Sequence, residues 1–138
     1  MKTHLKYTSF NQEKSIEELQ YNMLFQLDKL QFLKEELFFL QFLISSDIYS
    51  SKVMNLFENL EHFKKEINKQ LKTCEKLIID LSFHVNKITD KVECNDIACD
   101  NYFINTHTSL EQTTIKYFNQ VSQLKLEIYN YLQSVINS

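Results

Sequence analysis

The sequence contains no glycine, proline, tryptophan or arginine, and its only alanine is Ala98. Tight turns in β-sheets usually require glycine, Asn-Gly or proline. Their absence argues against β-sandwiches, β-barrels and Rossmann folds. It also excludes a glycine-rich phosphate-binding loop and the glycine-dependent elbow that exposes a catalytic serine. Cys94 or Cys99 with His84 or His107 could in principle form a thiol–imidazole pair, but no tight loop supplies an oxyanion hole, so we expect a protein that is not an enzyme.

The charge is close to balanced, because 18 acidic residues face 15 lysines and give a net charge of −3. Without arginine or a basic surface, nucleic acid is not an expected partner. Hydrophobic residues make up 43% of the chain and aromatic residues 13%, enough to form a packed core. We therefore expect a single folded domain over residues 1–138.

No segment reads as a membrane span or a secretory signal. The longest apolar cluster, at 37–44, is far shorter than the roughly 20 residues of a spanning helix. Three well-separated cysteines do not form a disulfide framework. These features predict a cytoplasmic protein that does not use a membrane as a partner.

Three long stretches carry apolar residues at coiled-coil-like spacing, and we predict helices at about 15–46, 51–92 and 108–137. Short connections favour antiparallel neighbours, so the expected fold is all-α, an antiparallel up-down-up bundle of three long coiled-coil-like helices. Residues 1–14 either trail flexibly or add a turn, and 93–108 reads as a connection that contains one or two helical turns.

Local signals support the first helix. Ser15 and Glu18 form a capping-box pattern at its start. Cys74 lies on the apolar seam of the second helix and should be buried. The predicted core seam of the first helix consists of Ile16, Leu19, Met23, Leu30, Leu33, Leu37, Leu40 and Ile44.

Aromatic residues recur on the first helix away from this seam. Phe25, Phe32 and Phe39 follow one another every seven residues, and Phe42 lies nearby. At 100° per residue they lie about 120–140° around the helix from the seam. We predict that they form a dimer interface or the contact with another protein's helices. Alternatively, the N-terminal segment or the 93–108 connection folds over these rings.

Polar residues also occupy seam positions. Gln26 and Gln70 have the register to meet across the first two helices, or their amides reach solvent at the edge of the seam.

One set of residues has the types that bind metals. Asp80 and His84 are four residues apart on the second helix, as are His107 and Glu111 near the third. The antiparallel register would bring both pairs together, as at bundle sites for a divalent metal ion. The Glu-x-x-His motif of di-iron bundles is missing. The alternative is that His84 is a hydrogen-bonded core histidine and His107 a loop residue.

Cys94 and Cys99 lie close together in an acidic segment. They are candidates for a regulatory disulfide and, alternatively, for packing thiols, because acidic neighbours raise a thiol's pKa and reduce its reactivity.

Two parts of the chain have a familiar pattern. They are LDKLQFLKEELFFLQFLIS (27–45) with LFENLEHFKKEI (56–67), and ECNDIACDNYFINTH (93–107) with LKLEIYNYLQSVI (124–136). Together they resemble small all-helical bacterial proteins without an assigned activity. The resemblance implies an all-α fold and a bacterial cytoplasmic setting, and it implies no function.

The sequence thus predicts a non-catalytic structural or protein-interaction bundle that self-associates and requires no cofactor. The alternative prediction is a metal-binding or redox-sensing bundle that uses the histidines and carboxylates, or the cysteine pair, described above.

Overall fold

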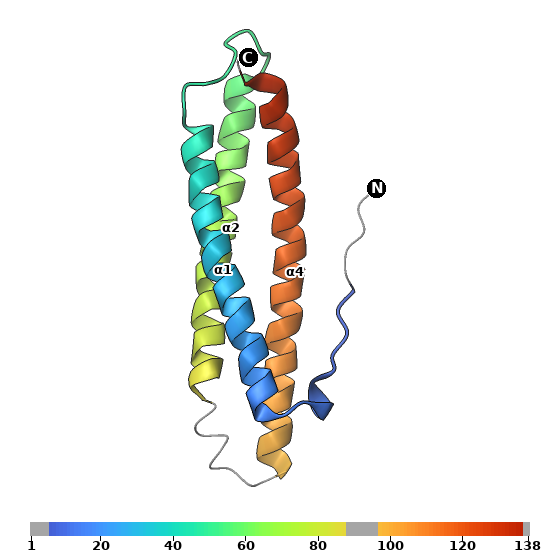
Figure 1. Ribbon diagram of the computed structural model, residues 1–138. Helices are drawn as coiled ribbons and strands as arrows, with labels where there is room; N and C mark the ends of the chain where they lie inside the picture. The colour runs from blue at the N-terminus through green and yellow to red at the C-terminus, as the bar shows by residue number, and fades with distance from the viewer. Residues whose placement is uncertain (1–5, 88–96, 137–138) are drawn as a thin grey trace.

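The computed structural model describes residues 6–87 and 97–136, without the side chains of 97–100. Figure 1 shows three long helices side by side, with α2 antiparallel to both α1 and α4. This arrangement confirms the all-α, up-down-up bundle. The elements in chain order are the short 3-10 helix η1 (Asn11–Glu13), α1 (Ile16–Ile44), α2 (Leu56–Asn86) and α4 (Ile97–Val135).

Helix α1 begins where the sequence predicts. The side chain of Ser15 accepts a hydrogen bond from the backbone of Glu18, and the Glu18 carboxylate accepts one from the backbone of Ser15. This reciprocal capping box satisfies two amide groups that the first turn of a helix leaves without partners.

Helix α2 begins at Leu56, later than the predicted start near residue 51. The chain turns first, and Asn55 adopts a left-handed backbone conformation with φ 58° immediately before the helix. Asparagine tolerates this conformation better than most residues, so it takes the place that glycine often fills. The helix ends at Asn86, and the rest of the predicted range, 88–92, lies outside the described residues.

Helix α4 begins at Ile97, well before the predicted start near residue 108. The prediction of a connection at 97–108 is therefore wrong. Phe103, His107 and Glu111 recur every four residues and are all buried, so they continue the inner face of the helix toward its N-terminus. Two of these inward residues are polar, which is why the apolar pattern did not reveal this part of the helix.

The core follows the predicted seams closely. Along α1 every predicted seam residue is buried except Ile16, which is half-buried. Cys74 on α2 is fully buried as predicted, and its thiol donates to the carbonyl oxygen of Leu30 at 3.4 Å. Tyr117 on α4 donates to the carbonyl oxygen of Gln70 at 2.8 Å and thereby joins α4 to α2.

The end of the bundle where α1 connects to α2 is closed by the C-terminal end of α4. The backbone amide of Ser50 donates to the carbonyl oxygen of Val135 at 2.8 Å. Tyr49 and Ile136 form an antiparallel β-bridge at the same place. In the described part of the chain, no helix has the combination of length and apolar character that crossing a membrane requires.

Candidate functional site

Two histidines meet inside the bundle at the end opposite this closure. His84 projects from α2 and His107 from α4, and they are only 4% and 0% exposed. Nε2 of His84 lies 3.0 Å from Nδ1 of His107, which is hydrogen-bond distance. Phe103 stacks on the ring of His84 with a centroid separation of 4.6 Å. The structure therefore places His107 within a helix and not in a loop.

Glu111 lies one helical turn beyond His107 and collects polar groups from three parts of the chain. Its Oε1 accepts hydrogen bonds from Asn11 Nδ2 at 2.7 Å and from the hydroxyl group of Tyr7 at 3.1 Å. Its Oε2 accepts one from Gln26 Nε2 at 3.3 Å and lies 3.7 Å from Nε2 of His107. A single buried carboxylate thus joins the N-terminal segment, α1 and α4. We call these polar residues, all buried except the half-buried Gln26, the polar cluster: Asn11, Gln26, His84, His107 and Glu111.

The environment fixes the protonation of two members of the polar cluster. Burial lowers the pKa of His84 to about 4, and the neighbouring His107 and Lys87 contribute to the shift. Burial alone would raise the pKa of Glu111, but its interactions with His107, Asn11 and Tyr7 outweigh burial and lower that pKa to about 2. At neutral pH, Glu111 is therefore an anion and His84 is uncharged.

The two imidazoles and the Glu111 carboxylate form one chain of contacts. Nε2 of His84 and Nδ1 of His107 share a hydrogen bond in which either ring nitrogen can be the donor. Nε2 of His107 lies 3.7 Å from the Glu111 carboxylate, which is beyond hydrogen-bond distance. The two histidines and Glu111 therefore belong to one buried polar network.

The four metal-ligand candidates do not converge. His84, His107 and Glu111 lie together, whereas the carboxylate of Asp80 lies 3.1 Å from the ammonium group of Lys76 in a partly exposed ion pair. Within the described residues, no three histidine, cysteine, aspartate or glutamate side chains are grouped as a metal site would require. The Glu111 carboxylate accepts hydrogen bonds from two side-chain amides and a hydroxyl group, and these donors stabilise its negative charge.

The polar cluster contains residues that the sequence did not single out as partners of Glu111. The predicted pairing of Gln26 with Gln70 is wrong, because Gln26 donates to Glu111. Asn11 and Tyr7 come from a segment without periodicity, so no pattern in the sequence connects them to α4. The position of Gln26 on an apolar seam was the one signal that a buried polar partner was needed.

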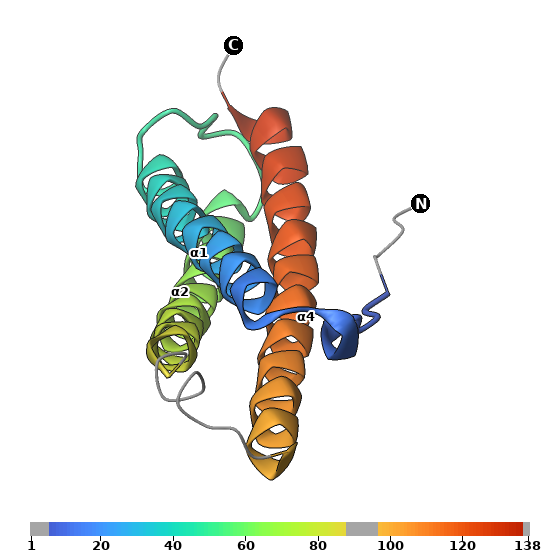
Figure 2. The same ribbon diagram turned by 60° about the horizontal axis from the view of Figure 1, so that its bottom comes forward.

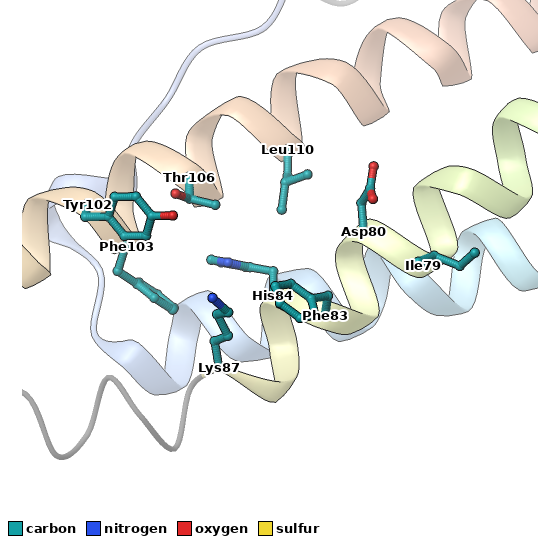
Figure 3. Close-up of a pocket in the computed structure, with 9 residues that line it drawn as sticks. All are labelled: Ile79, Asp80, Phe83, His84, Lys87, Tyr102, Phe103, Thr106 and Leu110. Atoms are coloured by element: carbon teal, nitrogen blue, oxygen red, sulfur yellow. The ribbon is translucent and has the colours of Figure 1, made fainter.

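A pocket of about 400 Å³ adjoins the polar cluster between α2 and α4 (Figure 3). His84 and Phe103 line it, and so do Asp80 and Lys87 near its ends. The other lining residues are Ile79, Phe83, Tyr102, Thr106 and Leu110.

The predicted aromatic interface lies on the outer side of α1. Phe25, Phe32, Phe39 and Phe42 are 61%, 70%, 58% and 69% exposed. Phe39 and Phe42 also contact each other, with ring centroids 6.5 Å apart. Tyr21 is 70% exposed and follows the same line along the helix. We call these five residues the α1 aromatic face.

The N-terminal segment does not cover the α1 aromatic face. Its described part turns through η1 and packs against α4 instead, as Figure 2 shows. Tyr7 and Asn11 make the hydrogen bonds to Glu111, and Phe10 is 68% exposed. The alternative that residues 6–14 shield the rings is therefore wrong.

The predicted cysteine pair falls largely outside the described residues. Cys94 is not described, and Cys99 lies in α4 without a described side chain. The third cysteine, Cys74, is buried, and this burial raises the pKa of its thiol. A raised pKa makes Cys74 a packing residue and not a reactive one.

Comparisons with protein-family models, with curated proteins and with solved structures find no match to this chain. The predicted resemblance to small bacterial helical proteins therefore stays a prediction. A functional proposal therefore depends on which side chains are buried and which are exposed.

Proposed function

We propose that the protein is a non-catalytic interaction module that self-associates as a dimer through the α1 aromatic face. One observation carries this proposal: four phenylalanines on the outer side of a single helix are each 58–70% exposed. The opposite side of the same helix supplies the leucines of the core. A helix that is apolar on both sides is stable in water only when something covers its outer side.

The size of the α1 aromatic face suits a dimer. At about 200 Å² for each aromatic side chain, its five members leave roughly 600 Å² of apolar surface exposed. That area is at the upper end of the patches seen on monomers, which reach about 300–600 Å². It is also most of the roughly 800 Å² that each partner contributes to a stable complex.

The spacing of the rings suits a second copy of this chain better than an unrelated partner. Phe25 and Phe39 lie equally far along the helix from Phe32. Two antiparallel copies of α1 related by a two-fold axis at Phe32 would therefore place Phe25 against Phe39 of the second copy. Such self-complementarity is what a symmetric dimer requires.

Charge is compatible with the same register. It would place Lys29 beside Glu35 of the second copy, although the Lys29 ammonium group also lies 4.6 Å from the centre of the Phe118 ring. Asp28 would approach Glu36 of the second copy, but the Glu36 carboxylate already has a partner, because Lys125 Nζ lies 2.7 Å from it. The charged residues around the rings therefore do not oppose the antiparallel pairing.

The double substitution Phe32→Glu/Phe39→Glu tests this function. It places two like charges at the centre of the interface, and both sites point away from the core. Sedimentation velocity should show a dimer for the unmodified protein and a monomer for the variant, with equal helicity by circular dichroism. The control is Phe57→Glu on α2, where the phenylalanine is 78% exposed and lies outside the α1 aromatic face. A variant that sediments like the unmodified protein would contradict the proposal.

A further inference from the structure

The pocket beside the polar cluster is a separate feature from the α1 aromatic face. Its volume of about 400 Å³ lies within the range of small-molecule sites, which is about 300–1,000 Å³. α2 provides one wall and α4 the other, as Figure 3 shows. The pocket is therefore large enough for one compact organic molecule.

The exposed wall of this pocket is mostly apolar. Phe83, Ile79 and Leu110 line it, and Phe83 and Ile79 are 62% and 67% exposed. Behind them, the rings of His84 and Phe103 stack on each other with their centroids 4.6 Å apart, and they are only 4% and 5% exposed. A planar apolar group would therefore gain burial mainly against Phe83 and Ile79.

The charge of the pocket is positive at one end. Lys87 is the only cation among the described lining residues, and its ammonium group lies 4.6 Å from the centre of the Phe83 ring. No carboxylate of the described residues forms an ion pair with it. Asp80, the only carboxylate among the described lining residues, is paired with Lys76 at 3.1 Å. An anionic group would therefore meet a lysine that has no ion-pair partner in the described part of the chain.

Hydroxyl groups lie toward the same end of the pocket. In the view of Figure 3, Tyr102 and Thr106 lie with Lys87 toward one end, while Ile79 lies at the other. Hydroxyl groups can donate hydrogen bonds to a carboxylate. The pocket thus combines a polar, cationic end with an apolar body.

We propose that this pocket binds a small aromatic carboxylate, with its ring against the exposed wall of Phe83 and Ile79 and its carboxylate at Lys87. A planar ring suits the apolar wall, and one negative charge suits the one lysine among the described lining residues. The site is independent of the α1 aromatic face and of dimer formation.

The test compares two matched probes, 1-naphthylacetate and its neutral amide, 1-naphthylacetamide, by isothermal titration calorimetry. The acid should bind at least about tenfold more tightly, because a hydrogen bond to a charged group contributes about 1.5–3 kcal/mol. Lys87→Gln should remove this preference and leave binding of the amide unchanged. The control, Lys72→Gln, changes an exposed lysine on α2 outside the pocket and should alter neither affinity.

Two further variants locate the bound probe. Ile79→Glu alters a lining residue that is 67% exposed, so the fold should persist while both probes bind more weakly. The Phe32→Glu/Phe39→Glu protein should bind both probes as the unmodified protein does. Equal affinities for acid and amide, no binding of either, an equal loss in Lys72→Gln, or loss in the α1 variant would each overturn the proposal.

Discussion

The two ends of the bundle are built in different ways. At the end where α1 connects to α2, which we call the apolar end, the buried side chains are hydrophobic, with Ile44, Ile128 and Val135 among them. At the opposite end, the polar cluster replaces such a core with amides, imidazoles and a carboxylate. Both ends belong to the same three helices (Figure 1).

The two ends therefore contribute to different properties, the apolar end to the free energy of folding and the polar cluster to the specificity of helix register. Apolar side chains contribute free energy roughly in proportion to the area they bury, and many alternative packings give similar values. Buried hydrogen bonds require particular atoms at particular distances, so a shifted helix would leave the Glu111 carboxylate without partners. We infer that the apolar end supplies most of the free energy of folding, and that the polar cluster fixes the register of α4 and holds the N-terminal segment.

The largest effect should come from the apolar end. Ile128→Ala removes a side chain that is 0% exposed, and it should lower the free energy of unfolding by about 2–5 kcal/mol. The loss should be the same at pH 7 and pH 5, because no titratable group is removed. Urea denaturation followed by circular dichroism measures it. Leu126→Ala, at a site 42% exposed on the same helix, is the control and should cost much less. If both variants lost the same free energy of unfolding, burial at the apolar end would not be the main source of stability.

A smaller effect is expected at the polar cluster. Glu111→Gln keeps the shape of the side chain but removes the charge that receives hydrogen bonds from Asn11, Tyr7 and Gln26. The free energy of unfolding at pH 7 should fall by about 1–3 kcal/mol. The same urea titration measures this loss, with the exposed Glu75→Gln as the control. If the two substitutions cost the same, Glu111 does not organise this end.

Among the described residues, His84 and Glu111 of the polar cluster should give the main pH dependence of stability between pH 7.5 and pH 3. The pKa of His84 falls from its ordinary value of 6.5 to about 4 in the folded protein. Below pH 6.5 the unfolded chain therefore binds a proton that the folded protein does not bind, and stability falls until about pH 4. The pKa of Glu111 falls from 4.5 to about 2, so its stabilising charge is fully present above pH 4.5 and is lost as the pH falls toward 2.

Urea midpoints between pH 7.5 and pH 3 measure this dependence. His84→Gln should remove the decline between pH 6.5 and pH 4, whereas Glu111→Gln should remove the decline below pH 4.5. Ile128→Ala should lower every midpoint and leave the shape of the curve unchanged. A midpoint that stays constant from pH 6.5 to pH 4 in the unmodified protein would show that His84 is not buried as described.

The smallest effect should be local to the N-terminal segment. Asn11→Ala removes the 2.7 Å hydrogen bond to Glu111 and should cost about 1.5 kcal/mol, the lower end for a hydrogen bond to a charged group, because Tyr7 and Gln26 still donate to the carboxylate. Hydrogen exchange should become faster in residues 6–14 and remain unchanged around Tyr49 and Val135. Gln12→Ala, at the exposed neighbouring position, should change neither region. Faster exchange at the apolar end would show that the two ends are not independent.

The sequence was sufficient to predict most of the fold and part of the polar cluster. The α1 seam, the capping box and the burial of Cys74 follow from apolar spacing and local hydrogen bonding, which are properties of neighbouring residues. The start of α4 at Ile97 was missed because its inward positions carry His107 and Glu111, so apolar periodicity stops before the helix does.

Partners in the polar cluster were predictable only where register determines them. The antiparallel register brings His84 to His107, and the structure has this contact. The same register also matched Asp80 with Glu111, but Lys76 pairs with Asp80, and Asn11 and Tyr7 pair with Glu111. The partners of Asp80 and Glu111 depend on the N-terminal segment, which has no regular pattern, and on which of several donors reaches each carboxylate. The spacing of residues along the sequence does not predict either of these.

No described residue of either end covers the α1 aromatic face, and we propose that a second copy of the chain covers it. Native mass spectrometry of protein purified without chelator or affinity metal tests this self-association, because one spectrum gives both the number of subunits and any bound mass. We expect a metal-free species of about twice the 16.6 kDa chain mass. A spectrum that contains only the 16.6 kDa monomer at every concentration would contradict the claim.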